Sequence, residues 1–330
     1  MRIAINGMGR IGRLLFRRLI EMKGIDLVAV NDPMETGNLA YLLNYDSIYG
    51  TFPTKVLDSG NRLVVNEKQV NTFRQLNPSQ LPWKELGIDV VLECSGQFTT
   101  RDKASLHLQA GAKKVLLSTT GSSDIPLLIY GFNQHLLHDS VNIVSPGGCM
   151  TNCVTHIFFI LNSIGIESVQ VNILHSYTSR QALVDAPHAQ FRRGRAAAES
   201  IIPVEIDLSH SIERLFPMLH NKVAAISTRV PVANGALADF SIQLKQPSTK
   251  QAINQLFKTS AAHDYKNVVE YNEDPLVSLD IKGNTNSCVI DGTLTSVVGN
   301  HLKLITWFDN EYGYTSRMID WLQYWQPKIK

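Results

Sequence analysis

One cysteine stands where its neighbours would make it reactive. Cys149 directly follows a Pro-Gly-Gly turn and precedes an apolar run, residues 154–164, that predicts a helix. Unpaired N–H groups at a helix N-terminus carry partial positive charge, which lowers the pKa of a thiol and favours the nucleophilic thiolate. The sequence therefore predicts a nucleophilic cysteine, a group that proteases, thiolases and redox sensors also use.

A glycine-rich turn near the N-terminus has the spacing of a dinucleotide-binding fingerprint. A strand-like segment, residues 3–6, leads into G-x-G-x-x-G, and an amphipathic segment, residues 13–20, follows it. Gly7 would permit the tight turn, Gly9 would let a pyrophosphate approach the backbone, and Gly12 would let helix and strand pack. The N-terminus of the helix would receive the anion.

An acidic residue follows at the distance that this fingerprint requires. A second strand-like segment, residues 27–31, ends at Asp32, 20 residues past Gly12. A carboxylate there accepts hydrogen bonds from the ribose hydroxyls and repels a 2′-phosphate. The pattern predicts NAD rather than NADP as the cofactor.

Strands continue to alternate with helices through the first half of the chain, which predicts a doubly wound parallel sheet of the Rossmann type. The polar pairs Ser95-Gly96 and Ser118-Thr119 end two of the strands, and we expect them at the carboxyl edge, where such sheets bind ligands. The predicted segments are a strand over 89–96, a helix over 101–110 and a strand over 114–118.

Longer strand-like segments after Cys149 predict a second, α+β domain with a mixed sheet. We expect residues 1–148 to form the cofactor domain, residues 149–312 the catalytic domain, and a helix over 313–330 to return to the first. The predicted strands cover residues 170–175, 222–230, 238–244, 277–280 and 302–308.

Composition and charge limit the kinds of partner that the protein could bind. The chain has 330 residues, 44% of them apolar, and a formal charge of +2, and it lacks any basic run that would favour nucleic acid or a membrane. Its four cysteines form neither a disulfide framework nor a C-x-x-C metal pattern, which favours a reducing compartment and no metal. With no leader-like or membrane-spanning segment in view, we expect a cytoplasmic protein whose partners are small molecules or its own copies.

Six motifs follow one another in order along the chain: INGMGRIGR at 5–13, CMTNC at 149–153, HSYT at 175–178, RRGRAAA at 192–198, RVP at 229–231 and DNEYGY at 309–314. In this order they resemble the glyceraldehyde-3-phosphate dehydrogenase family. Further stretches resemble its erythrose-4-phosphate dehydrogenase branch, among them residues 42–46, 81–87, 200–204 and 212–217, although Tyr177-Thr178 and residues 185–188 look like the glyceraldehyde branch.

The resemblance implies a thioester mechanism in which Cys149 attacks an aldehyde and His175 is the catalytic base. Hydride would pass to NAD, and phosphate or water would release the acyl group. The resemblance further implies a homotetramer built partly on residues 177–198. It places NAD against Gly7, Gly9, Arg10, Ile11, Gly12, Asp32, Ser95, Gly96, Ser118, Thr119, Asn310 and Tyr314.

The same resemblance implies contacts to a substrate phosphate. It points to Thr178 and Arg229, with Arg192 or Arg193 from the intervening loop, and to Thr151 beside the nucleophile. Arginine suits a phosphate because its planar fork donates two hydrogen bonds. Arg180 is unusual in this motif, and its interpretation as a substrate contact competes evenly with that of a solvated surface side chain.

The chain departs from the family where attacking inorganic phosphate normally binds. Gly148 and Met150 replace the usual hydroxyl residues around Cys149, and Ile206 and Asp207 replace the usual Thr-Gly. Each lost hydrogen bond to a charged ligand is worth about 1.5–3 kcal/mol, so phosphate should bind poorly. Either water releases the thioester or phosphate uses other donors.

Three functions stay open at this point. The first is an NAD-dependent dehydrogenase of glyceraldehyde 3-phosphate or erythrose 4-phosphate. The second is a non-phosphorylating, hydrolytic dehydrogenase of a related aldehyde. The third is a degenerate NAD-binding redox sensor, against which the intact Cys149, His175 and Asp32 argue.

Overall fold

The structure is a computed structural model that describes residues 1–328. Two compact units divide the chain. The first comprises residues 1–148 together with the C-terminal segment from Arg317, and the second comprises Cys149–Ser316, so the division falls within helix α7 (Tyr312–Trp325).

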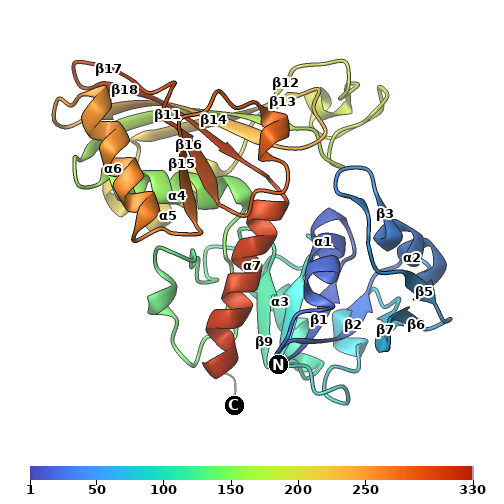
Figure 1. The fold of residues 1–330 in the computed structure, drawn as a ribbon. Coiled ribbons are helices and arrows are strands. Elements are labelled where there is room, and N and C mark those ends of the chain that lie inside the picture. The colour runs from blue at the N-terminus through green and yellow to red at the C-terminus, as the bar shows by residue number, and fades with distance from the viewer. Residues whose placement is uncertain (329–330) are drawn as a thin grey trace. The chain divides into compact units, whose positions relative to one another are not determined.

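The first unit is built on an eight-stranded sheet in the order β10-β9-β8-β1-β2-β7-β6-β5 (Figure 1). The strands from β10 to β7 pair in parallel, whereas β5, β6 and β7 form an antiparallel edge that the sequence patterns did not predict. The strands are β1 (Arg2–Asn6), β2 (Asp26–Asn31), β5 (Val56–Asp58), β6 (Arg62–Val65), β7 (Lys68–Phe73), β8 (Val90–Glu93), β9 (Lys114–Leu117) and β10 (Ile143–Val144).

The strand order places the crevice of this sheet between β1 and β8. The chain moves from β1 to β2 on one side and from β8 to β9 on the other, so right-handed crossovers put their helices on opposite faces. Such a reversal of direction is where doubly wound sheets bind ligands. The helices are α1 (Arg10–Leu19), α2 (Thr36–Asn44) and α3 (Arg101–Gln109), with a short hairpin of β3 (Tyr45–Asp46) and β4 (Gly50–Thr51) and the 3-10 turns η1 (Pro78–Gln80) and η2 (Gln134–Leu136).

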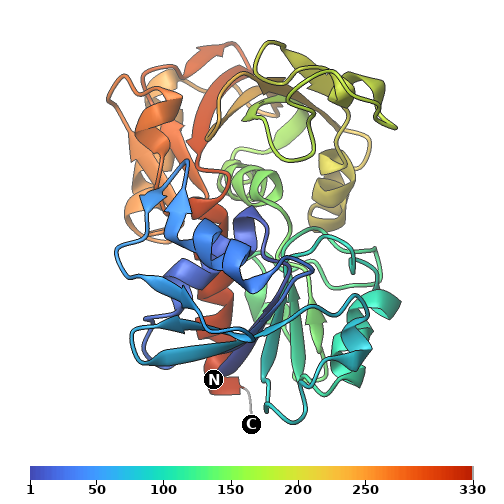
Figure 2. The ribbon, with the colours of Figure 1, turned by 90° about the vertical axis from the view of Figure 1, so that its right-hand side faces the viewer.

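The second unit is built on a mixed sheet in the order β12-β13-β11-β14-β18-β16-β15, with β17 beside β18. Helix α4 packs against one face of this sheet, as Figure 2 shows. The elements are α4 (Cys149–Leu161), β11 (Ile166–Ser176), η3 (Phe191–Gly194), β12 (Ile202–Val204), α5 (Leu208–Leu215), η4 (Pro217–Leu219), β13 (Val223–Val230), β14 (Ala236–Leu244), α6 (Lys250–Ala262), β15 (Val269–Asn272), η5 (Ser278–Ile281), β16 (Cys288–Asp291), β17 (Ser296–Val298) and β18 (His301–Phe308).

The predicted strand over residues 277–280 is wrong. The segment forms the 3-10 turn η5, because the Asp280 carboxylate accepts a hydrogen bond from the Val277 N–H at 2.8 Å and closes the turn. Val277 and Leu279 are both exposed, so the apolar residues that suggested a strand contribute nothing to the core. The other strands predicted in this half are present with small changes at their ends.

Candidate active site and cofactor edge

The predicted nucleophile and base lie together in the second unit. Cys149 is the first residue of α4, and the Cys149 Sγ lies 3.9 Å from Nε2 of His175, near the end of β11. The helix begins directly after the glycine turn, as the sequence predicted. This separation lets the imidazole receive a proton from the thiol as a substrate draws the two groups together.

Burial, rather than the helix N-terminus, dominates the resting state of the thiol. Burial raises the pKa of Cys149 to about 11, and the charge of Arg229 and the Met150 N–H act in the opposite direction. The expectation of a resting thiolate at the helix end was therefore wrong, since removal from water penalises the charged form more than the helix end favours it. A nucleophilic role for Cys149 would therefore require a base.

His175 is a neutral base at rest. Burial, followed by the positive charge of Arg229, lowers its pKa to about 3. Its Nδ1 lies 2.7 Å from the Ser176 carbonyl oxygen and 2.6 Å from Arg229 Nη1. A guanidinium can only donate, so in one tautomer Nδ1 carries no proton and accepts from Arg229. In the other tautomer Nδ1–H donates to the Ser176 carbonyl oxygen, and Nε2 is then free to take a proton.

The sheet itself brings Arg229 to the histidine. β11 and β13 pair in parallel, and their register sets His175 opposite Arg229. The Arg229 side chain is buried, and burial lowers its pKa to about 10, with Arg193 and Arg180 acting in the same direction. A buried cation that faces other cations favours an anionic ligand.

Buried donors without partners support an anion site here. Within residues 1–328, Arg229 Nε, Arg193 Nη1 and Gln181 Nε2 make no hydrogen bond. Arg193 lies in η3 with its Nε on Gln190 Oε1, and it is buried, whereas the neighbouring Arg192 is exposed. Unsatisfied buried donors cost about 1–3 kcal/mol each, which a phosphate oxygen would recover. Of the two loop arginines considered for the substrate phosphate, the structure favours Arg193 over Arg192. It also adds Gln181 to the buried side chains with an unsatisfied donor, a residue that the sequence patterns missed.

The remaining predicted substrate residues differ in exposure. The Thr178 N–H and Oγ1 both donate to Gln181 Oε1, at 2.9 and 3.0 Å. The Arg180 side chain is exposed, and the backbone N–H of Arg180 donates to Thr178 Oγ1 at 3.3 Å. Thr151 is buried in the first turn of α4. Thr178 therefore shares a hydrogen-bonded turn with Gln181, one of the residues with an unsatisfied donor.

Two hydrogen bonds to its side-chain oxygen fix the orientation of the Asn310 amide. Its Oδ1 accepts from the Gly235 N–H at 2.9 Å and from Ser176 Oγ at 3.2 Å, so its Nδ2 is the group that would donate to a nicotinamide carboxamide. The turn before α7 is made by Asp309, whose Oδ1 accepts from the N–H groups of residues 311 and 312. Asp309, rather than Asn310, therefore closes this turn. Tyr314 is buried within α7.

In the first unit the three glycines have the three environments that the fingerprint requires. Gly7 has φ +93°, and a Cβ there would lie 2.4 Å from Ser95 N; a Cβ on Gly12 would lie 2.0 Å from the Gly7 carbonyl oxygen. A Cβ on Gly9 would meet nothing within 4 Å. Gly9 thus leaves open space before α1, whose first turn carries no acidic residue, and a pyrophosphate fits this cradle.

The other cofactor-edge residues follow the strand ends. Asp32, directly after β2, accepts from the Met8 and Met34 N–H groups at 2.7 and 2.9 Å. Ser95-Gly96 follow β8 and Ser118-Thr119 follow β9, at the same edge of the sheet. Arg10 pairs with Asp46, so Arg10 and Ile11 would meet a pyrophosphate through their backbone N–H groups.

A largely parallel sheet with a glycine cradle, together with a thiol on α4 near an imidazole on β11, is typical of an NAD-dependent oxidoreductase. Residues 1–101 match the family model of the glyceraldehyde 3-phosphate dehydrogenase NAD binding domain, and residues 148–310 match that of the C-terminal domain. The chain belongs to the glyceraldehyde-3-phosphate dehydrogenase family. The predicted fold class and the NAD cofactor are confirmed, whereas these two models do not distinguish the erythrose-4-phosphate branch.

In residues 1–328 no helix is long and apolar enough to cross a membrane. Over the same range no three His, Cys, Asp or Glu side chains gather in a way that could hold a metal ion.

Proposed function

We propose that the protein oxidises a phosphorylated short aldose, D-glyceraldehyde 3-phosphate or D-erythrose 4-phosphate, with NAD in central carbon metabolism. One observation carries the proposal: a cysteine and a histidine 3.9 Å apart stand beside a buried arginine with an unpartnered Nε. The first two groups suit an aldehyde and the third suits the phosphate of the same molecule.

The reaction would begin with transfer of the Cys149 thiol proton to Nε2 of His175 as the sulfur attacks the aldehyde carbon. The oxygen of the resulting thiohemiacetal takes up a proton from the imidazolium, and His175 removes it again when the carbon is oxidised. Bound NAD would supply the acceptor for the hydride that leaves this carbon. The product at Cys149 is an acyl thioester.

The phosphate end of the substrate would bind the arginine cluster. Arg229 and Arg193 would donate through the atoms that lack partners, and Thr178 would add its hydroxyl. A phosphate there also offsets the charge of Arg229, which is one cause of the low pKa of His175. Binding of the correct substrate would therefore strengthen the base that its oxidation needs.

Water is the acyl acceptor that the site favours. Gly148 and Met150 offer no hydroxyl to inorganic phosphate. The acidic side chains of Glu205 and Asp207, which follow β12, are exposed and offer an anion no hydrogen-bond donor. Hydrolysis of the thioester would yield the free acid, as in the non-phosphorylating alternative.

The test is NADH formation with each sugar phosphate, with and without inorganic phosphate, in the wild type and in Cys149→Ser. We expect turnover without phosphate, a free-acid product and no turnover in the variant. Strict dependence on phosphate would refute the hydrolytic step and leave the dehydrogenase intact. Absence of turnover with both sugars would refute the substrate class.

We further propose a cytoplasmic homotetramer. Apolar side chains are exposed on the loop that follows β11, at Leu183, Val184, Phe191 and Ile201, and Phe191 is 89% exposed. Side chains of this kind favour burial against another copy. All four cysteines are free thiols, in keeping with a reducing compartment. Sedimentation velocity of the wild type and of Phe191→Glu tests the assembly, and a monomeric wild type would refute it.

A further inference from the structure

Buried polar side chains join four strand ends of the first sheet. Glu93 ends β8, Asn6 ends β1 and Asn31 ends β2, and each is at most 4% exposed. Asn6 Nδ2 donates to Glu93 Oε2 at 2.5 Å, and Asn31 Nδ2 donates to Asn6 Oδ1 at 2.7 Å. Beyond β7, the Gln75 N–H donates to Asn31 Oδ1 and its carbonyl accepts from Asn31 Nδ2. These four residues, Glu93, Asn6, Asn31 and Gln75, form the carboxyl-edge belt.

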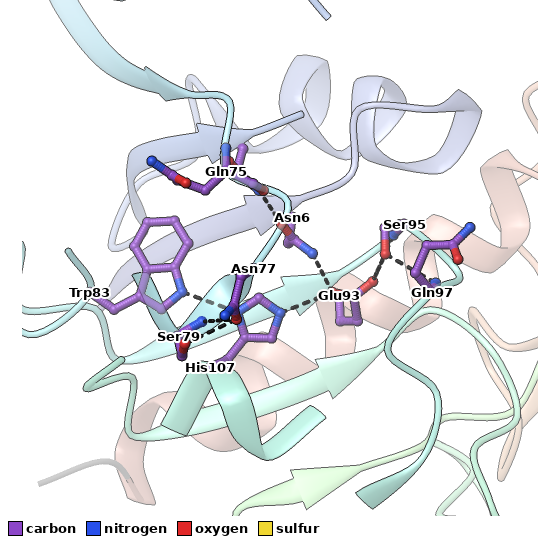
Figure 3. Close-up of polar contacts among 10 residues, drawn as sticks. Asn6, Gln75, Asn77, Ser79, Trp83, Glu93, Ser95, Gln97 and His107 are labelled. Atoms are coloured by element: carbon purple, nitrogen blue, oxygen red, sulfur yellow. Dashed lines mark hydrogen bonds and ion pairs between the residues drawn. The ribbon is translucent and has the colours of Figure 1, made fainter. Parts of the chain in front are cut away.

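Glu93 anchors this belt through both of its carboxylate oxygens. Its Oε1 accepts from Ser95 N–H and Ser95 Oγ, at 2.8 and 2.5 Å, and its Oε2 accepts from Asn6 and from His107 Nε2 at 3.0 Å (Figure 3). Four hydrogen bonds therefore hold this one side chain. Burial, followed by the charge of Glu93, raises the pKa of the Cys94 thiol.

Trp83 determines which nitrogen of His107 carries the proton. The Trp83 indole N–H, which can only donate, lies 3.1 Å from His107 Nδ1, and both side chains are fully buried. Nδ1 must therefore offer its lone pair, and the single ring proton lies on Nε2, facing Glu93. His107 is therefore a neutral donor whose tautomer is held by a core tryptophan. Figure 3 shows the ring between Trp83 and Glu93.

Each belt residue that ends a strand lies one or two residues before a residue expected to bind the cofactor. Gly7 follows Asn6, Asp32 follows Asn31, and Ser95 lies two residues past Glu93. Ser95 is also the residue that a Cβ on Gly7 would strike, so the turns after β1 and β8 are packed together. Fixing Glu93 therefore fixes the backbone on both sides of the crevice.

We propose that Glu93 and His107 are positioning residues that hold the turns after β1 and β8 ready for NAD. Neither side chain needs to touch the cofactor, because Glu93 acts through the Ser95 N–H and Asn6, and His107 acts by supplying the last donor to Glu93. Without this donor the turn gains freedom, and NAD binding must then order it.

Calorimetric titration of NAD into the full-length protein tests the proposal. His107→Leu removes the donor, and we expect the Kd of NAD to rise about tenfold, equivalent to about 1.4 kcal/mol. His107→Gln supplies an amide N–H in place of Nε2–H and an amide oxygen in place of the Nδ1 lone pair, both on one carbon, as the two ring nitrogens are on Cε1. Its Kd for NAD should stay within about threefold of the wild-type value. His156→Leu, which alters another fully buried histidine in the second unit, is the control for lost stability and should leave the Kd unchanged.

In Glu93→Gln, the direction of the change in NAD affinity distinguishes a charge effect from a positioning role. Removing a negative charge from an edge that receives pyrophosphate should tighten NAD binding if charge alone matters, whereas a positioning role predicts weaker binding because the amide sets N–H groups against other donors. Tighter binding in Glu93→Gln, or an unchanged Kd in His107→Leu at a lowered Tm, would overturn the proposal. If His107→Leu does not fold, Glu93→Gln and His107→Gln still decide it.

Discussion

Replacing Gly148 by serine should convert the enzyme towards phosphate-dependent turnover. The backbone accepts the change, because Gly148 lacks the positive φ of its neighbour Gly147 (φ +72°) and a Cβ built on it meets no heavy atom within 4 Å. One hydroxyl hydrogen bond to a charged phosphate oxygen is worth about 1.5–3 kcal/mol. At 1.4 kcal/mol for each factor of ten, the KM for phosphate should fall roughly 10- to 140-fold.

The assay follows NADH and product together. Turnover is measured over a range of phosphate concentrations, and free acid is separated from acyl phosphate in each sample. In Gly148→Ser the acyl phosphate fraction should rise at phosphate concentrations where the wild type yields acid. The KM for the aldehyde should hardly change, because the arginine cluster around Arg229 is untouched.

Gly148→Ala is the matched control, since it adds the same Cβ without a hydroxyl. It should keep the wild-type KM for phosphate. If Gly148→Ser and Gly148→Ala behave alike, the missing hydroxyl does not limit phosphate binding. A wild type that already produces acyl phosphate at a low KM would refute the reasoning altogether.

Three further predictions concern the substrate, the base and the cofactor. Arg229→Ala should raise KM for a phosphorylated aldehyde far more than for its unphosphorylated analogue, and equal effects would exclude the phosphate role. His175 is inactive as a base when protonated, and its pKa of about 3 should rise when a substrate phosphate offsets Arg229. The acid limb of kcat should therefore lie at higher pH than that of kcat/KM, and coincident limbs would contradict this coupling. Asp32→Ser should lower the preference for NAD over NADP, measured as the ratio of kcat/KM values, because the carboxylate that repels a 2′-phosphate is gone; an unchanged ratio would place discrimination elsewhere.

Local sequence patterns predicted much of the fold because a strand or helix depends largely on the residue types within its own short segment. Alternation of strands and helices in the first half predicted β2, α3 and β9 nearly to the residue. The same approach failed at residues 277–280, where a single carboxylate closes a turn that apolar composition cannot reveal. It also missed the short strands β15 and β16, which lie in the second half of the chain, where strands and helices do not alternate regularly.

The sequence by itself determined the reactive groups of this protein. It specified a cysteine at a helix start, a histidine at a strand end, and three glycines whose lack of a side chain a pyrophosphate cradle requires. These follow from residue type and short spacing, which depend on few degrees of freedom. The family motifs add the same information along the chain.

Only the tertiary structure decided the state of those groups. Burial raises the pKa of Cys149 against the effect of its helix, and the register of two strands sets Arg229 beside His175. Burial likewise distinguishes Arg193 from Arg192. Desolvation and charge pairing depend on residues far apart in the chain, and no local pattern encodes them. The cysteine at the start of α4 is therefore a predicted nucleophile by sequence, and by structure it is a half-buried thiol whose raised pKa would make it depend on a base.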